Sequence, residues 1–144
     1  MAAIDILALA NHAEAINGLL YLSGAGWTNV TRVYPVGEQP NPHHFGIGIS
    51  VLVPWSEAND RHSLAVWIES EDGGEPLMKA AEGELEVGRP AGLPHGSDLR
   101  SVLAIDATVA FPRQGGYRAV VELNGDRSTY AFTVTDRVSA PLSA

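Results

Sequence analysis

Apolar side chains recur at every second position along most of this chain, and this alternation constrains the fold more than any other feature. The clearest run is 45–53, where every odd position is apolar and two of the even positions are glycines. A period of two places alternate side chains on opposite faces of an extended strand, whereas a helix needs a period of about 3.6. Similar runs occur near 62–70, 99–109, 116–123 and 127–135. The sequence therefore predicts an all-β chain.

Turn signals separate these runs. Asn17-Gly18, Asp72-Gly73-Gly74 and Asn124-Gly125-Asp126 are typical of tight turns, because their residues accept positive φ. Regular spacing of short strands and turns favours a single antiparallel β-sandwich, of immunoglobulin-like or jelly-roll topology. We also expect a bulge near Gly83 and one helical turn within 55–60, capped by Ser56. The pattern predicts about nine strands, near 3–11, 19–24, 29–34, 45–53, 62–70, 77–87, 99–109, 116–123 and 127–135.

Length and composition bound the class of protein. The 144 residues fit one domain, so we expect a β-sandwich over 1–138 and a frayed tail over 139–144. The absence of cysteine excludes thiol nucleophiles, thiolate metal sites and disulfides. A net charge of −8 opposes binding to nucleic acid or to an anionic membrane. The chain begins without the positive segment of a signal peptide, and no stretch approaches the roughly 20 apolar residues of a membrane span, so we expect a cytoplasmic protein.

Four phrases of the sequence carry a resemblance. They are Asn17-Gly18-Leu19 with Gly24-Ala25-Gly26-Trp27, Val53-Pro54-Trp55-Ser56-Glu57-Ala58-Asn59, Gly83-Glu84-Leu85-Glu86-Val87-Gly88-Arg89-Pro90, and Gly115-Gly116-Tyr117-Arg118. Together they resemble a family of small bacterial proteins that are expected to be β-sandwiches and have no assigned activity. The resemblance covers roughly residues 3 to 135. It implies the fold, and it transfers no functional residue.

Two adjacent histidines, His43 and His44, are the weak candidates for a metal site, with Glu14, Glu71 or Asp72 as a carboxylate partner. Neighbouring residues of an extended segment point to opposite faces, so they seldom bind one ion together. We therefore expect no metal and no other cofactor.

No catalytic residue is predicted. A serine hydrolase of the Gly-x-Ser-x-Gly type is excluded because that phrase does not occur. The glycine-rich segment 23–26 is not followed by a helix that would present backbone amides to a phosphate. We expect that the chain is not an enzyme.

The order of strands and loops predicts which loops meet. If successive strands run in opposite directions, the loops at 25–28, 54–61, 88–98 and 124–126 share one end of the sandwich. The loops at 12–18, 35–44, 71–76 and 110–115 then share the other. Tryptophan and arginine are frequent in binding sites because they bury large areas and direct hydrogen bonds. The first end would hold the candidate ligand- or partner-binding residues, which could alternatively cap the core: Trp27, Trp55, Asn59, His62, Arg89 and His95.

Three functional hypotheses remain open. The first is a non-enzymatic binding or assembly module that self-associates as a homodimer or binds another protein. It rests on sparse charge along 45–53 and 99–109 and on the glycine-lined face of the first of these strands. The second is a small-molecule or carbohydrate-binding domain that uses Trp27, Trp55 and Arg89. The third is a metal-dependent hydrolase that uses the two histidines.

Overall fold

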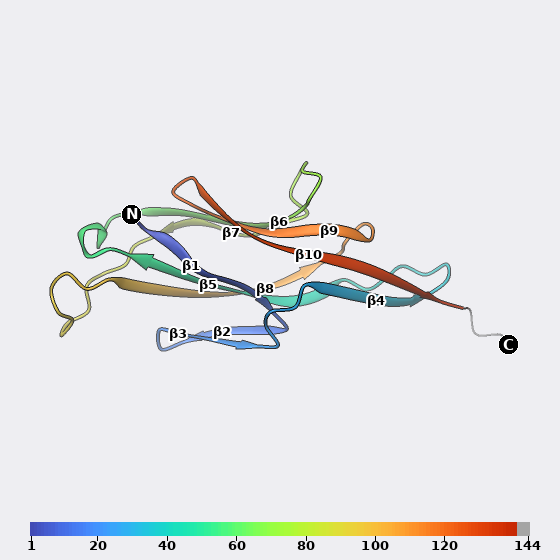
Figure 1. Ribbon diagram of the computed structural model, residues 1–144, viewed down its shortest axis with the longest axis horizontal. Helices are drawn as coiled ribbons and strands as arrows, with labels where there is room; N and C mark the ends of the chain where they lie inside the picture. The colour runs from blue at the N-terminus through green and yellow to red at the C-terminus, as the bar shows by residue number, and fades with distance from the viewer. Residues whose placement is uncertain (141–144) are drawn as a thin grey trace.

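The computed structural model describes residues 1–140, and it consists almost entirely of β-strands (Figure 1). The all-β prediction is confirmed. The single helical element is a 3₁₀ turn, Trp55–Glu57, inside the segment expected to be helical. The ten strands are β1 Ala3–Ala10, β2 His12–Ile16, β3 Leu19–Ser23, β4 Asn29–Pro35, β5 His43–Val53, β6 His62–Ser70, β7 Met78–Leu85, β8 Leu99–Val109, β9 Gly115–Leu123 and β10 Asp126–Ser139.

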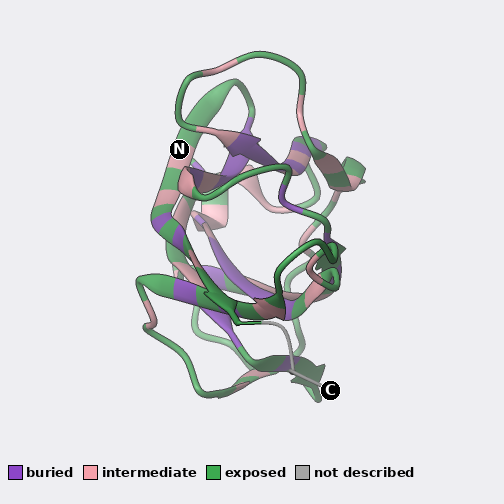
Figure 2. Cartoon of the chain, turned by 90° about the vertical axis from the view of Figure 1, so that its right-hand side faces the viewer, coloured by how far each residue is buried: buried purple, intermediate pink, exposed green. Residues whose placement is uncertain are grey.

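Two sheets face each other and form the sandwich. One has the order β1-β5-β8, and the other has the order β4-β10-β9-β6-β7. All neighbouring strands are antiparallel except β4 and β10, which run parallel. Figure 2 shows the buried segments on strands that line the interior, while the connecting loops are mostly exposed. The odd positions of β5, from Phe45 to Val53, are fully buried, as the alternation predicts.

A hairpin of β2 and β3 forms a third layer over the outer face of β5 (Figure 1). Two glycines of β5 allow this close approach. A Cβ at Gly46 would lie 2.6 Å from the backbone nitrogen of Ala13, and a Cβ at Gly48 would lie 2.6 Å from Cδ2 of Leu22. Ala13 and Leu22 are also a cross-strand pair, so they share one face of the hairpin. The glycine face of β5 is therefore covered by the chain itself.

The structure has ten strands where about nine were expected, because β2 lies in a segment that was expected to be a loop. The chain reverses at Asn11, where no glycine or proline marks a turn. A second deviation follows, since β3 and β4 run in the same direction across the segment 24–28 (Figure 1). The two deviations cancel, so every strand from β4 onward has the direction that the alternating order predicts. Two of the predicted loop placements are therefore wrong: the loop at 25–28 lies away from the Trp55 turn, and the segment 12–18 is β2 with a hairpin turn that is directed toward the end of β5 that precedes Trp55 (Figure 1).

Local expectations are met in part. Asn17 and Gly18 have φ of 51° and 76°, which suits the predicted hairpin turn. The bulge lies opposite Val66 and Trp67, where β7 skips from Ala81 to Lys79, and not at Gly83. The 3₁₀ turn begins after Pro54 without a side-chain cap, so the expected role of Ser56 was wrong. Pairing of β10 extends to Ser139, Ala140 follows outside any strand, and 141–144 of the expected tail lie outside the described residues.

Candidate functional site

The turn after β5 brings three of the candidate residues into contact. The guanidinium carbon of Arg89 lies 4.3 Å from the centre of the Trp55 ring, and its Nη2 donates a 2.6 Å hydrogen bond to the Trp55 carbonyl. The His95 ring lies 5.1 Å from the same indole. The indole also packs against the core. We call this region, defined by residues 54–62 and 87–95, the Trp55 end.

Asn59 and His62 belong to the same end, and both have partners within the chain. Asn59 has a φ of 65°, and its backbone N–H donates to the Val87 carbonyl at 2.9 Å. The His62 side chain is buried, with Nδ1 at 2.9 Å from Nδ2 of Asn124 and Nε2 at 3.4 Å from the Glu57 carbonyl. An amide N–H donates, so Nδ1 accepts and Nε2 carries the proton. The contacts of the Trp55 end are those of a structural cap on the core.

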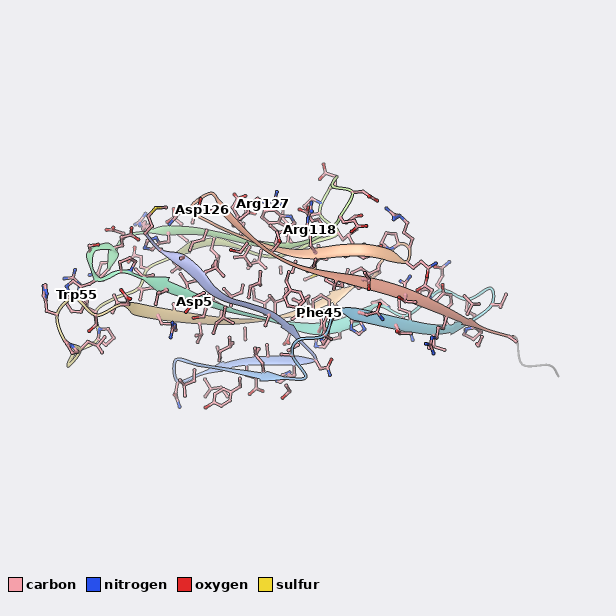
Figure 3. All side chains as sticks on the ribbon, viewed as in Figure 1. Asp5, Phe45, Trp55, Arg118, Asp126 and Arg127 are labelled. Carbon is pink, nitrogen blue, oxygen red and sulfur yellow. The ribbon has the colours of Figure 1, made fainter. Side chains whose placement is uncertain are left out.

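Trp27 does not join this group, which corrects the predicted placement. Its ring contacts Phe45 and Phe132 edge-on, with centroids 5.8 and 5.6 Å away. Phe45 lies near the first residue of β5, whereas Trp55 follows its last residue, so the two tryptophans lie far apart along the sandwich (Figure 3). The physical reason is that β3 and β4 run in the same direction, so the segment 24–28 that joins them lies away from the Trp55 end.

A shallow cavity of about 490 Å³ lies beside Trp27. Polar side chains from three segments line it, among them Asn11, Asn29 and His43. The indole Nε1 of Trp27 is buried and has no hydrogen-bond partner within the described residues. Trp27 thus combines an unused donor with a cavity that its side chain lines, whereas the buried Nε1 of Trp55, which also has no partner within the described residues, lies where the indole packs against the core.

The two histidines lie in β5 and not in a loop. His43 stacks on Phe45 with centroids 5.9 Å apart, and burial lowers the pKa of His43. His44 points to the other face, where Nδ1 lies 3.0 Å from Oγ1 of Thr108. Glu14 lies on the hairpin layer, where its carboxylate is 2.8 Å from Nε2 of His12. Within residues 1–140, no three histidine or carboxylate side chains are arranged to hold a metal ion, so the arrangement gives the metal-dependent hydrolase hypothesis no support.

An ion-pair network that the sequence did not predict lies on the outer face of the five-stranded sheet (Figure 3). The buried carboxylate of Glu69 accepts hydrogen bonds from Trp67 Nε1 at 2.6 Å, Arg118 Nε at 2.8 Å and Arg127 Nη2 at 3.1 Å. Burial alone would raise the pKa of Glu69, but the hydrogen bonds from Trp67 and Arg118 and the two positive charges lower it. The alternation in the sequence placed these side chains on the outer face of the sheet. It did not show that residues of three different strands would pair there.

A second network that the sequence did not predict lies at the end of the sandwich opposite the Trp55 end. Arg32 of β4 is buried, and its Nε and Nη2 donate to the two carboxylate oxygens of Asp136 in β10 at 2.7 and 2.9 Å. Its Nη1 donates to the Phe111 carbonyl at 2.7 Å, and the Tyr34 hydroxyl donates to Asp136 at 3.0 Å. The hydrogen bond from Arg32 is the main reason that the pKa of Asp136 lies below its ordinary value. Arg32 is thus held by both carboxylate oxygens of Asp136 and by the Phe111 carbonyl, which is the arrangement of a structural clasp.

The edges of the sheets differ in how they are protected. Natural edge strands avoid pairing with other chains through charge, bulges, proline or short length. β1 carries Asp5 and a bulge, β4 ends at Pro35, β7 carries Lys79 and three glutamate or glycine positions, and β2 and β3 have five residues each. β8 is the longest of these edge strands, with 11 residues. It pairs with β5 along its full length on one side.

The other side of β8, its free edge, makes no backbone hydrogen bond with another segment among the described residues. Its central stretch, 101–105, is uncharged, and all five of its side chains are partly exposed. The only charged residues of the strand are Arg100 and Asp106, which flank this stretch and are exposed. The central stretch of the free edge of β8 therefore has no charge, bulge or proline of its own, and the strand is not short.

Comparison with known proteins identifies a family and nothing closer. A family model described as "Family of unknown function (DUF6941)" matches residues 5–135. No curated protein and no solved structure matches the chain. Among the described residues, no helix has the length and apolar character that crossing a membrane requires.

Proposed function

The chain belongs to the DUF6941 family of unknown function, and we propose that it is a non-enzymatic β-sandwich module whose copies associate through the free edge of β8. The free edge carries this proposal, because unpaired N–H and C=O groups on an apolar edge are a template for a second strand. The five uncharged, partly exposed residues at 101–105 would be shielded by such pairing. A cytoplasmic location belongs to the same proposal, in keeping with a chain that has no cysteine.

The structure changes which strand supports self-association. The glycine-lined face of β5 no longer counts toward it, since the hairpin of β2 and β3 covers that face. The sparse charge of 99–109 still counts, because this strand lies at an edge and not in the middle of its sheet.

We also propose that the sandwich has an immunoglobulin-like topology, which would support the assignment as a binding module. The order β1-β5-β8 corresponds to strands A, B and E of that fold, and β10-β9-β6-β7 corresponds to G, F, C and C′. Near the start of β9, the Tyr117 hydroxyl donates to the Arg113 carbonyl four residues upstream. A tyrosine at this position of strand F is a hallmark of such sandwiches. β4 and the hairpin are additions to that plan. Because one fold serves many functions, this likeness supports the class of module and not a ligand.

Sedimentation of the purified protein tests the proposal. We expect a reversible monomer–dimer equilibrium at concentrations of about 1–100 µM, the range in which weak homodimers form. A single monomeric species up to about 100 µM would contradict self-association as its function.

A second candidate function, binding of a small polar molecule or a sugar, is favoured by the cavity beside Trp27. The unpaired indole N–H and the neighbouring amides of Asn11 and Asn29 are groups that hold hydroxyl oxygens. A change in tryptophan fluorescence on titration with monosaccharides, lost in Trp27→Phe but kept in Trp55→Phe, would support it. No change with either neutral or charged sugars would count against it.

A further inference from the structure

The charges on β8 restrict how two copies can pair. Arg100 and Asp106 are six positions apart, so both side chains lie on the same face of the strand. This is also the face of Val102 and Ala104, on the side of the hairpin layer. The Arg100 and Asp106 side chains are 54% and 64% exposed, so each can reach a second chain.

Two identical strands that pair around a two-fold axis are antiparallel, and one residue on the axis faces its own copy. With the axis at Leu103, Arg100 faces Asp106 of the partner subunit, and the same pair forms a second time by symmetry. With the axis at Val102, Asp106 instead faces Asp98 of the partner subunit. An axis at Arg100 or Asp106 places like charges against each other.

The axis at Leu103 also matches the apolar residues. Val102 then faces Ala104 of the partner subunit on the outer side, and Leu103 faces its own copy on the core side. These are the partly exposed side chains at the middle of the free edge. Seven opposing pairs between positions 100 and 106 supply about six to eight backbone hydrogen bonds.

The Arg100 guanidinium is already oriented within its own chain. Its Nη2 donates to the Asp5 carboxylate of β1, and β1 and β8 flank β5 on either side. In this conformation the guanidinium is directed toward β1, away from the free edge of β8, so pairing with a partner subunit requires the Arg100 side chain to turn from Asp5 toward that edge. The neighbour of Asp106 within the chain is His44, with Nε2 at 3.8 Å.

We propose that a second copy of this chain docks on the free edge of β8, antiparallel and with the two-fold axis at Leu103, and that the symmetric Arg100–Asp106 pairs set this register. The inference rests on the self-association proposed above, and it adds the surface, the orientation and the residues that select the partner. The resulting sheet is continuous across both subunits, with six strands in the order β1-β5-β8-β8-β5-β1.

Two charge-reversal variants, studied separately and as a mixture, test the register. In Arg100→Asp alone, both pairs become Asp against Asp, and in Asp106→Arg alone, both become Arg against Arg. Opposing like charges on facing strands destabilise a pair, so each variant should dimerise at least about tenfold more weakly than the natural chain. A mixture of the two variants restores two attractive pairs, so it should form a heterodimer of near-natural affinity. Lys79→Glu, a charge reversal on the β7 edge, should leave dimerisation unchanged.

The outcomes separate this inference from the proposed function. Heterodimers in the mixture, measured by sedimentation with one variant fluorescently labelled, support the register independently of any effect of the substitutions within a chain. If the natural chain dimerises but both variants dimerise equally well, or the mixture gains nothing, the register is wrong and self-association stands. If the natural chain stays monomeric, the proposed function fails first. Circular dichroism of each variant checks that it is folded.

Discussion

Adding one methyl group at Gly46 perturbs the contact that holds the hairpin layer on the sandwich. A Cβ at this position would lie 2.6 Å from the backbone nitrogen of Ala13 and 2.8 Å from its Cβ. Neither atom is the end of a flexible side chain, so the hairpin must lift away from β5. Overpacking of this kind typically costs about 1–3 kcal/mol. We expect Gly46→Ala to lower the free energy of unfolding by that amount and the melting temperature by roughly 3–10 °C.

Two other glycines serve as matched controls. At Gly48 the new Cβ would meet Cδ2 of Leu22 at 2.6 Å, a side-chain end that can rotate, so Gly48→Ala should cost less than Gly46→Ala. At Gly83 a Cβ would meet nothing within 4 Å, and the φ is not positive. Gly83→Ala should be neutral or stabilising by up to about 1 kcal/mol, because alanine lowers the entropy of the unfolded chain.

Urea unfolding followed by circular dichroism measures all three variants on one scale. The expected order of stability is Gly83→Ala highest, then Gly48→Ala, then Gly46→Ala. Equal stability of Gly46→Ala and Gly83→Ala would refute the packing of β2 against β5. If Gly48→Ala loses more stability than Gly46→Ala, then β3 and not β2 makes the closest contact of the hairpin with β5.

Further predictions concern the two ends of the sandwich and metals. Asp136 has a pKa held below its ordinary value, so its contribution to stability is present above the unfolded pKa and is lost as the pH falls through the folded pKa. Asp136→Asn leaves buried Arg32 without its carboxylate, so it should lower the free energy of unfolding by about 2–3 kcal/mol at neutral pH. It should also weaken the acid dependence of urea unfolding, and an unchanged acid dependence would contradict this. Arg89→Ala removes an exposed cation–π contact and a hydrogen bond, so it should cost about 0.5–1 kcal/mol and leave association unchanged. Lost association in a folded Arg89→Ala protein would instead assign the Trp55 end to binding. Adding EDTA should leave the melting temperature unchanged, and a decrease would return His43 and His44 to consideration as ligands.

The local sequence pattern was sufficient to predict most strands, because alternation and turn chemistry act over neighbouring residues. β6 and β8 have the bounds that the sequence predicts. β2 was missed because the chain reverses at Asn11, and the reversal is held by distant contacts. The backbone N–H of Asn11 donates to the Gly24 carbonyl, and Gly46 accommodates the returning strand. Neither contact leaves a signal near Asn11 in the sequence.

The candidate sites show the same limit. The Trp55 end assembles as the alternation of strand directions predicts, although the sequence could not show that Arg89 and His95 would cover the indole. Arg32 and Asp136 are 104 positions apart, and their pairing depends on the parallel register of β4 and β10. The edge position of β8 likewise follows from sheet order, which alternation does not specify.

Hydrogen exchange of the β8 amides at two protein concentrations tests the central claim most directly. At about 1 µM the chain should be mostly monomeric, and at about 100 µM mostly dimeric, if the dimer is of the weak kind proposed. We predict that exchange slows with concentration at residues 100–106, while β7 and β4, the edges of the other sheet, are unaffected. Exchange in β8 that does not change with concentration, in a protein shown to dimerise, or slowing confined to another edge, would contradict association through the free edge of β8.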